Sequence, residues 1–165
     1  MNESYVEILI KRRSQPMHMV IKVGMLVLTV AVFLLGLLVH WLILIPGLFL
    51  LVADNFALPL LDVEYEYLYV SGELTIDKIM GKSRRKNCFT GEMDKIELIA
   101  PKDSPKISEL GALKYVEKDY TSGRNEKPVY VCVFRGEKEV SRVLFEPDSK
   151  MLELMYQTSP RKVVR

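Results

Sequence analysis

The stretch that decides the fold is MHMVIKVGMLVLTVAVFLLGLLVHWLILIPGLFLLVADNFALPLL, residues 17–61. It contains only two charged side chains, Lys22 and Asp54, and the 31 residues at 23–53 carry no charge at all. One membrane span needs about 20 apolar residues, and 31 residues in a single helix would extend roughly 46 Å, against a hydrocarbon core about 30 Å thick. The stretch therefore predicts two membrane-spanning helices.

Helix-breaking and amphipathic residues near the middle predict the turn between the two helices. Gly36, the His40-Trp41 pair and Pro46-Gly47 interrupt a run of Leu, Val and Ile, and Trp favours the membrane interface. We expect one helix at about 17–39 and a second at about 41–60. A cleaved signal peptide is the alternative, but its apolar core would be only about 7–15 residues long, which favours a retained hairpin.

Lys22 and Asp54 are the two charged residues of this hairpin. Lys22 lies close enough to the start of the first helix to extend its ammonium toward the headgroups. Asp54 has two interpretations: an interfacial residue near the end of a short span, or a functional carboxylate inside the membrane. The second would suit a transporter or channel that works as an oligomer.

Basic residues predict the orientation of the hairpin. Lys11, Arg12 and Arg13 precede the first helix, whereas the expected turn has no Lys or Arg. The positive-inside rule then places the N-terminus in the cytoplasm, and two crossings return the chain to the same side. We therefore expect a cytoplasmic N-terminal segment at 1–16, a transmembrane hairpin at 17–61 and a soluble cytoplasmic domain at 62–165.

The soluble half is predicted to be mainly β. Strands are expected at 63–70, 73–79, 83–89, 95–100, 129–134 and 139–145. The first of these places three tyrosines on one face, and Ser71-Gly72 is a turn signal. The segment at 107–118 reads as a strand or a short helix.

Near the C-terminus the spacing of apolar residues changes from the alternation of a strand to the spacing of a helix, so a helix is expected there. Asp148 or Ser149 is the predicted cap, and an apolar face at helical spacing follows it: Met151, Leu152, Leu154 and Met155. Antiparallel strands followed by one amphipathic helix predict an α+β domain: a bent sheet or partial barrel closed by the C-terminal helix. Residues 161–165 are expected to form a short basic tail.

Three segments carry a resemblance to a known family: residues 66–67, 72–86 (GELTIDKIMGKSRRK) and 93–97 (MDKIE). With the preceding hairpin, they resemble bacterial membrane-anchored pleckstrin-homology-like (PH-like) proteins. In those proteins a strand ends at a glycine, an arginine-rich strand follows, and an acidic-basic-Ile segment opens the next. The whole chain is similar to an uncharacterised family of small bacterial membrane proteins, a resemblance that implies a PH-like fold and no particular activity.

The residue types present argue against catalysis. Both histidines, His18 and His40, lie in the hairpin, so the soluble half lacks the base of a Ser-His or Cys-His pair. No phosphate-binding glycine motif occurs, and Glu64 and Glu66 are expected to face outward. We expect no enzyme, no cofactor and no metal site. A formal net charge of +2 argues against a nucleic-acid partner.

The two cysteines, Cys88 and Cys132, lack the spacing of a metal-binding pair. Both are expected to be buried or half-buried thiols on strands. A disulfide would require the domain to face an oxidising compartment.

One local cluster is a candidate functional site. It is a basic group formed by Lys78, Lys82, Arg84, Arg85 and Lys86. It reads either as a solvated hairpin that helps to set topology or as a contact with anionic lipid, which attracts juxtamembrane basic residues by about 1 kcal/mol each. PH domains often bind phosphoinositides through basic loops, but this group lies on a later hairpin, so headgroup specificity does not carry over.

The expected function is a membrane-anchored interaction module that presents a protein- or lipid-binding surface at the cytoplasmic face. Its expected partners are the bilayer and an unknown membrane or cytoplasmic protein. The alternative is an accessory subunit of a larger membrane complex or transporter, in which Gly24, Ala31 and Gly36 would serve helix packing.

Overall fold

The computed structural model describes residues 5–14, 16–109, 115–124, 126–136 and 139–164. The chain forms two compact units. The helical unit comprises residues 13–63 and 80–84, and the strand unit comprises the rest of the chain on both sides of it. Each unit is described by itself.

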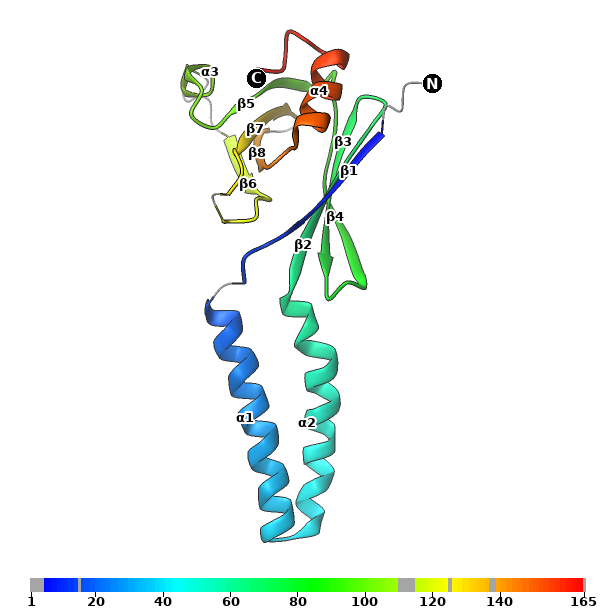
Figure 1. Ribbon diagram of the computed structural model, residues 1–165, viewed down its shortest axis with the longest axis vertical. Helices are drawn as coiled ribbons and strands as arrows, with labels where there is room; N and C mark the ends of the chain where they lie inside the picture. Colours follow the sequence, from blue (N-terminus) through cyan, green and yellow to red (C-terminus); the bar gives the residue numbers. More distant parts are fainter. Residues whose placement is uncertain (1–4, 15, 110–114, 125, 137–138, 165) are drawn as a thin grey trace. The chain divides into compact units, whose positions relative to one another are not determined.

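The helical unit is a hairpin of two apolar helices (Figure 1). Its elements are α1 (Pro16–Leu38), the 3-10 turn η1 (Trp41–Ile43), α2 (Leu44–Ala57) and the 3-10 turn η2 (Pro59–Leu61). The 23 residues of Pro16–Leu38 and the 21 residues of Trp41–Leu61 are each long and apolar enough to cross a membrane. The predicted pair of helices and the predicted turn between them are confirmed.

The turn of the hairpin is held by local contacts. The backbone N–H of Leu42 donates to Nδ1 of His40 at 3.3 Å, so His40 caps η1. A Cβ placed on Gly36 would lie 2.5 Å from Cδ2 of Leu44, whereas one on Gly24 would meet nothing within 4 Å. Gly36 therefore serves packing within the hairpin, and Gly24 leaves open space on α1.

The strand unit contains two four-stranded sheets. The first has the order β1-β2-β3-β4 and the second the order β5-β7-β8-β6. Their bounds are β1 (Tyr5–Lys11), β2 (Val63–Val70), β3 (Glu73–Met80), β4 (Arg84–Glu92), β5 (Ile96–Pro101), β6 (Tyr115–Asp119), β7 (Tyr130–Arg135) and β8 (Val140–Phe145). The short helix α3 (Pro105–Glu109) precedes β6, and α4 (Ser149–Thr158) ends the unit.

One detail differs from the predicted sheet. β6 pairs with β8 in parallel, so the expectation of antiparallel strands is wrong there. Parallel neighbours need a long crossover, and β7 lies in the chain between β6 and β8. The expected turn at 135–138 lies partly outside the described residues. The two sheets do not close into a barrel.

β1 is a strand that was not predicted from the sequence. It pairs antiparallel with β2, from Tyr5 opposite Val70 to Lys11 opposite Glu64. The helical hairpin is therefore inserted between two neighbouring strands of one sheet. The strand was missed because a β-hairpin is normally recognised by a short connection, and here the connection contains both apolar helices.

The inner face of the first sheet confirms the predicted row of tyrosines. Tyr65, Tyr67 and Tyr69 are buried, and the Tyr67 ring packs edge-on against Phe145 of β8, with 5.8 Å between ring centroids. From β1, Val6 faces Tyr69 in the strand register and is buried as well. The tyrosines thus link the first sheet to the second.

α4 covers this core with a narrower face than expected. Met151 and Met155 are fully buried, whereas Leu152 and Leu154 are half-buried. The cap is Asp148, whose Oδ1 accepts a hydrogen bond from the N–H of Met151 at 2.7 Å. The predicted helix and its cap are confirmed.

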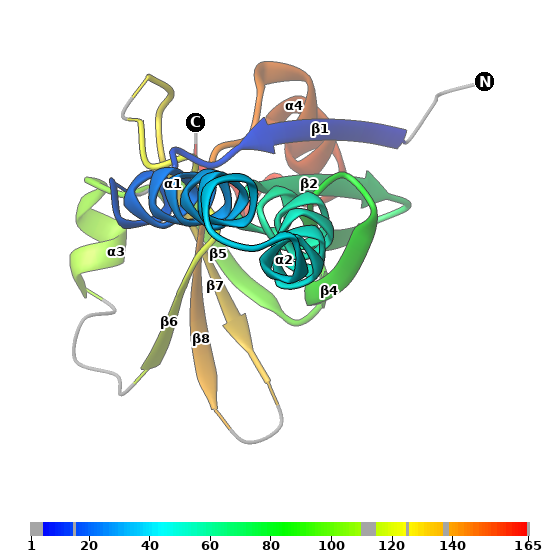
Figure 2. The ribbon, with the colours of Figure 1, turned by 90° about the horizontal axis from the view of Figure 1, so that it is seen from below.

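Within the expected basic tail, Lys162 and Val163 are bonded to other parts of the strand unit. Val163 forms a parallel bridge with Ile99 of β5, and Nζ of Lys162 donates to the carbonyl oxygens of Met93 and Asp94 at 2.7 and 2.9 Å. This segment extends the second sheet beyond β5. In Figure 2, β7 lies beside β8, and the four residues Tyr130–Val133 are buried, as predicted for a central strand.

Candidate functional site

The predicted basic group lies around the turn between β3 and β4. Lys78 is on β3 and half-buried, whereas the other four, Lys82, Arg84, Arg85 and Lys86, are exposed. Lys82 and Arg84 belong to the helical unit, and Lys78, Arg85 and Lys86 belong to the strand unit. The five residues are therefore divided between the two units, and their forming one lipid-contacting site stays a prediction.

The turn that carries Lys82 contacts the end of the second apolar helix. The N–H of Gly81 donates to the carbonyl oxygen of Asp62 at 3.1 Å. A Cβ on Gly81 would lie 3.1 Å from the carbonyl carbon of Pro59, and Gly81 has a φ of +59°. Both the left-handed backbone and the close approach favour glycine here. Lys82 therefore directly follows a residue that is held against the end of the hairpin.

Arg85 differs from its neighbours because its charge is already compensated. Its Nη2 lies 2.6 Å from Oε2 and 2.7 Å from Oε1 of Glu66, and its Nη1 lies 3.9 Å from Oδ2 of Asp77. Glu66 is buried rather than exposed as expected. Burial raises the pKa of this carboxyl group, and the neighbouring Arg85 guanidinium opposes the shift.

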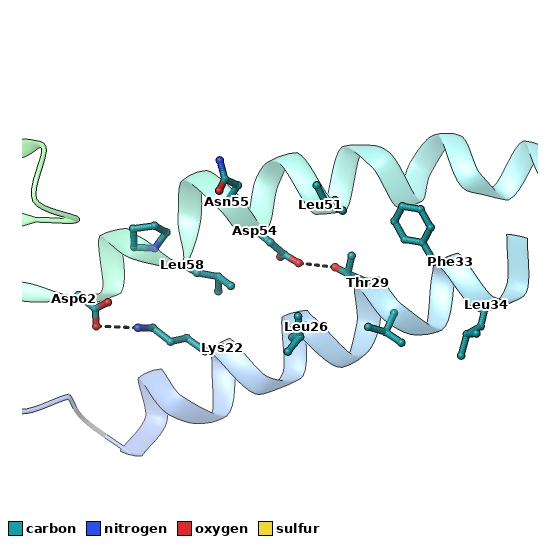
Figure 3. Close-up of a pocket in the computed structure, with 12 residues that line it drawn as sticks. Lys22, Leu26, Thr29, Phe33, Leu34, Leu51, Asp54, Asn55, Leu58 and Asp62 are labelled. Atoms are coloured by element: carbon teal, nitrogen blue, oxygen red, sulfur yellow. Dashed lines mark hydrogen bonds and ion pairs between the residues drawn. The ribbon is translucent and has the colours of Figure 1, made fainter.

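The helical unit contains a cavity of about 690 Å³ between α1 and α2 (Figure 3). Its polar lining residues are Lys22, Thr29, Asp54, Asn55 and Asp62, and the remainder of the lining is apolar. Lys22 does not extend alone, because its Nζ lies 2.8 Å from Oδ1 of Asp62. Oγ1 of Thr29 donates to Oδ2 of Asp54 at 2.6 Å. Asp54 is only 8% exposed, so it faces the partner helix.

A further buried carboxylate, Glu146, lies in the strand unit, where its hydrogen bonds serve the structure. It is 1% exposed, and its Oε1 accepts hydrogen bonds from the N–H and Oγ of Ser122 at 3.1 and 2.9 Å. The Tyr67 hydroxyl donates to the carbonyl oxygen of Tyr120 at 2.5 Å. These bonds fix the loop at 120–122 against the core, and burial raises the pKa of Tyr67.

The thiols show the predicted environments. Cys132 on β7 is fully buried, and burial raises its pKa to about 12, which makes it a poor nucleophile. Cys88 on β4 is half-buried. Within the described parts of the chain, no three His, Cys, Asp or Glu side chains converge as metal ligands would.

Two four-stranded sheets followed by a C-terminal helix suit a PH-like protein, and the hairpin of two apolar helices suits a membrane anchor. The chain belongs to the family described as Bacterial PH-like domain (DUF6106), which matches residues 2–165. The predicted resemblance is thereby confirmed. No curated protein and no solved structure matches the chain.

Two of these pairings, Thr29–Asp54 and Glu66–Arg85, were not predicted from the sequence. A signal for the first existed, since Thr29 is the one hydroxyl side chain within the apolar stretch of α1. The second had no sequence signal, because strand register decides which residues lie across from Glu66. Both pairs join residues from different elements.

Proposed function

We propose that this protein is a membrane-anchored, non-catalytic interaction module. Its PH-like unit presents a binding surface at the cytoplasmic face, and its juxtamembrane turn contacts anionic lipid headgroups. Family membership and the apolar hairpin support the class of protein. The lipid contact rests on Lys82, Arg84 and Lys86.

The observation that carries the lipid contact is the packing of Gly81 against Pro59 and Asp62. Where the hairpin spans a bilayer, the end of its second helix lies at the headgroups, so the ammonium of Lys82 lies near the same level. Arg84 belongs to the same compact unit. Basic residues at this level gain about 1 kcal/mol each from an anionic leaflet.

Arg85 and Lys78 contribute less to this surface. The Arg85 guanidinium is held by the buried Glu66 carboxylate, and releasing it would leave a buried charge uncompensated. Lys78 is half-buried. The proposed contact therefore uses the three remaining cations of the group.

The lipid contact is tested by the thermal stability of the full chain in neutral micelles doped with phosphatidylglycerol or phosphatidylcholine. A lipid that binds only the folded protein raises its melting temperature. Phosphatidylglycerol should stabilise the natural protein more than phosphatidylcholine does. The difference should disappear in 1 M salt, where the Debye length is about 3 Å.

The decisive variant replaces Lys82, Arg84 and Lys86 by Gln and leaves Arg85 in place. Its matched control replaces Lys102, Lys106 and Lys150, three exposed basic residues elsewhere on the strand unit. The first variant should lose the phosphatidylglycerol effect and the control should keep it. Equal stabilisation of both variants would refute the contact.

The proposed sidedness rests on the pairing of β1 with β2. The two ends of the hairpin lead into neighbouring strands of one sheet, so both ends belong on the same side of the membrane. Lys11, Arg12 and Arg13 favour the cytoplasm. In a variant without Cys88 and Cys132, an impermeant thiol reagent should label Trp41→Cys from outside intact cells and Lys150→Cys only after permeabilisation. The reverse pattern would refute this orientation.

The alternative, an accessory subunit of a larger membrane complex or transporter, is favoured by one observation. A methyl group placed on Gly24 would meet no atom within 4 Å, so α1 offers a small-residue surface for another helix. Affinity purification of the full chain from its native membrane tests this alternative. Stoichiometric recovery of one membrane partner would support it.

A further inference from the structure

The cavity between α1 and α2 contains one charge that no neighbour in the described parts of the chain compensates. Three charged residues line it: Lys22, Asp54 and Asp62. Lys22 and Asp62 neutralise each other at 2.8 Å, which leaves Asp54. Its Oδ2 accepts one hydrogen bond, from Thr29, and its buried Oδ1 has no hydrogen-bond partner among the described residues.

The depth of Asp54 makes this arrangement costly. Asp54 is eight residues before Asp62, and Thr29 is seven residues after Lys22, so at 1.5 Å per residue the carboxylate lies about 10 Å deeper in the hairpin than the ion pair. A carboxylate in apolar surroundings requires a cation or several hydrogen-bond donors. Thr29 supplies a single donor.

The rest of the cavity indicates what kind of cation fits. Leu26, Val30, Phe33 and Leu51 are among its apolar walls. A volume of about 690 Å³ lies within the range of about 300–1,000 Å³ that is typical of small-molecule sites. A calcium ion takes about six to eight oxygen ligands, which one carboxylate and one hydroxyl do not supply. An organic cation requires only the carboxylate and gains from the apolar walls.

We propose that this cavity binds an amphiphilic amine. The ammonium group would pair with the Asp54 carboxylate and donate to Oδ1, and the hydrocarbon body would lie along the apolar faces of α1 and α2. The Lys22–Asp62 ion pair lines the same cavity. No residue of the basic turn at 80–84 lines this cavity, so amine binding does not depend on lipid contact at that turn.

The test uses the full chain in neutral maltoside micelles with dansylcadaverine, a fluorescent primary amine on a five-carbon chain. Its N-acetylated derivative is the matched probe without charge. Saturable binding of the amine is expected, with binding of the acetylated probe weaker by about tenfold or more, since charge-assisted hydrogen bonds carry the affinity. Equal binding of the two probes, or no saturable binding, would overturn the proposal.

Two variants locate the probe. Asp54→Asn preserves the shape of the side chain and removes its charge, and it should weaken amine binding about tenfold. Asp103→Asn makes the same chemical change at an exposed position after β5 and should leave binding unchanged. Unchanged binding in Asp54→Asn would place the amine elsewhere and refute the site.

A third variant keeps the test valid if Asp54→Asn disturbs the hairpin. Leu26→Trp retains Asp54 and Thr29 and fills part of the cavity with a larger side chain. It should weaken binding of the amine, while circular dichroism shows the helical content of the natural protein. Full binding by a folded Leu26→Trp protein would show that the amine does not occupy this cavity.

Discussion

At the scale of single residues, two glycines of the same helix have opposite environments. A methyl group on Gly36 would lie 2.5 Å from Cδ2 and 3.1 Å from the backbone nitrogen of Leu44, whereas one on Gly24 would meet open space. Alanine is favoured over glycine in a helix by about 1 kcal/mol. Forcing a methyl into a filled contact costs about 1–3 kcal/mol. The two positions therefore form a matched pair.

We expect Gly36→Ala to destabilise the hairpin by about 1 kcal/mol, since the steric cost exceeds the gain in helix propensity. Gly24→Ala should be neutral or stabilising by up to about 1 kcal/mol. Unfolding of the full chain by added dodecyl sulfate in mixed micelles, followed by circular dichroism, measures both changes. Stabilisation by Gly36→Ala would contradict the close contact with Leu44.

Tyr67 predicts how stability depends on alkaline pH. Burial raises the pKa of this phenol above its ordinary value of 10.0, so above pH 10 the unfolded chain loses the proton while the folded chain retains it. The contribution is complete below pH 10 and is lost as the pH rises toward the folded-state pKa. The free energy of unfolding should fall by up to about 1.4 kcal/mol per pH unit in that window.

The variant Tyr67→Phe isolates this effect. It should be less stable at neutral pH, because the hydrogen bond to the carbonyl oxygen of Tyr120 is lost, and its stability should decline less steeply as the pH rises above about 10. Guanidinium unfolding at a series of pH values compares the two proteins. Parallel declines would show that Tyr67 titrates normally in the folded state.

At the scale of elements, α4 shows that helical spacing of apolar residues does not by itself determine which of them are buried. Its apolar residues follow helical spacing, yet only Met151 and Met155 are fully buried, and Leu154 is half-buried. Met155→Ala should destabilise the strand unit by about 2–5 kcal/mol, as expected for a large side chain removed from a core. Leu154→Ala should cost clearly less, about 1 kcal/mol. Thermal melting of both variants decides the order, and a larger effect of Leu154→Ala would contradict it.

Turns and strands could be predicted from the sequence where the residues that specify them lie close together in the chain. Ser71 and Gly72 have φ values of +49° and +88°, as in a two-residue hairpin turn, and the alternation in β2 correctly placed its tyrosines in the core. β6 was ambiguous because its parallel pairing with β8 depends on distant residues. Local sequence reports propensity and pattern, and it carries little information about partners far along the chain.

At the scale of the whole molecule, the pairing of β1 with β2 determines how the strand unit should be produced without its anchor. Residues 62–165 folding on their own remains a prediction, and such a fragment lacks β1. Replacing residues 13–62 by Asn-Gly would instead join β1 to β2 through a two-residue turn. This protein retains Val6 and Ile10, which are buried.

We expect the joined protein to be more stable than the 62–165 fragment by about 3–6 kcal/mol, since burial of one large apolar side chain contributes about 1.5–3 kcal/mol. Urea unfolding of the two proteins measures the difference. Val6→Asp in the joined protein should remove most of it, because a charge would then lie at a buried position. Equal stability of the joined protein and the fragment would show that β1 adds nothing to the fold.

The sequence by itself determined the apolar hairpin, the strands around the tyrosine row, the capped C-terminal helix and the PH-like resemblance. The first three follow from composition or periodicity within a short stretch of chain, whereas the last is a resemblance to a known family carried by residues 66–67, 72–86 and 93–97. Only the tertiary structure decided that β1 joins the sheet, that Glu66 holds Arg85 and that Asp54 meets Thr29. The reason is physical: these pairings join residues separated by 19 to 65 positions in the chain, and hydrogen bonds and burial bring them together only after the chain has folded.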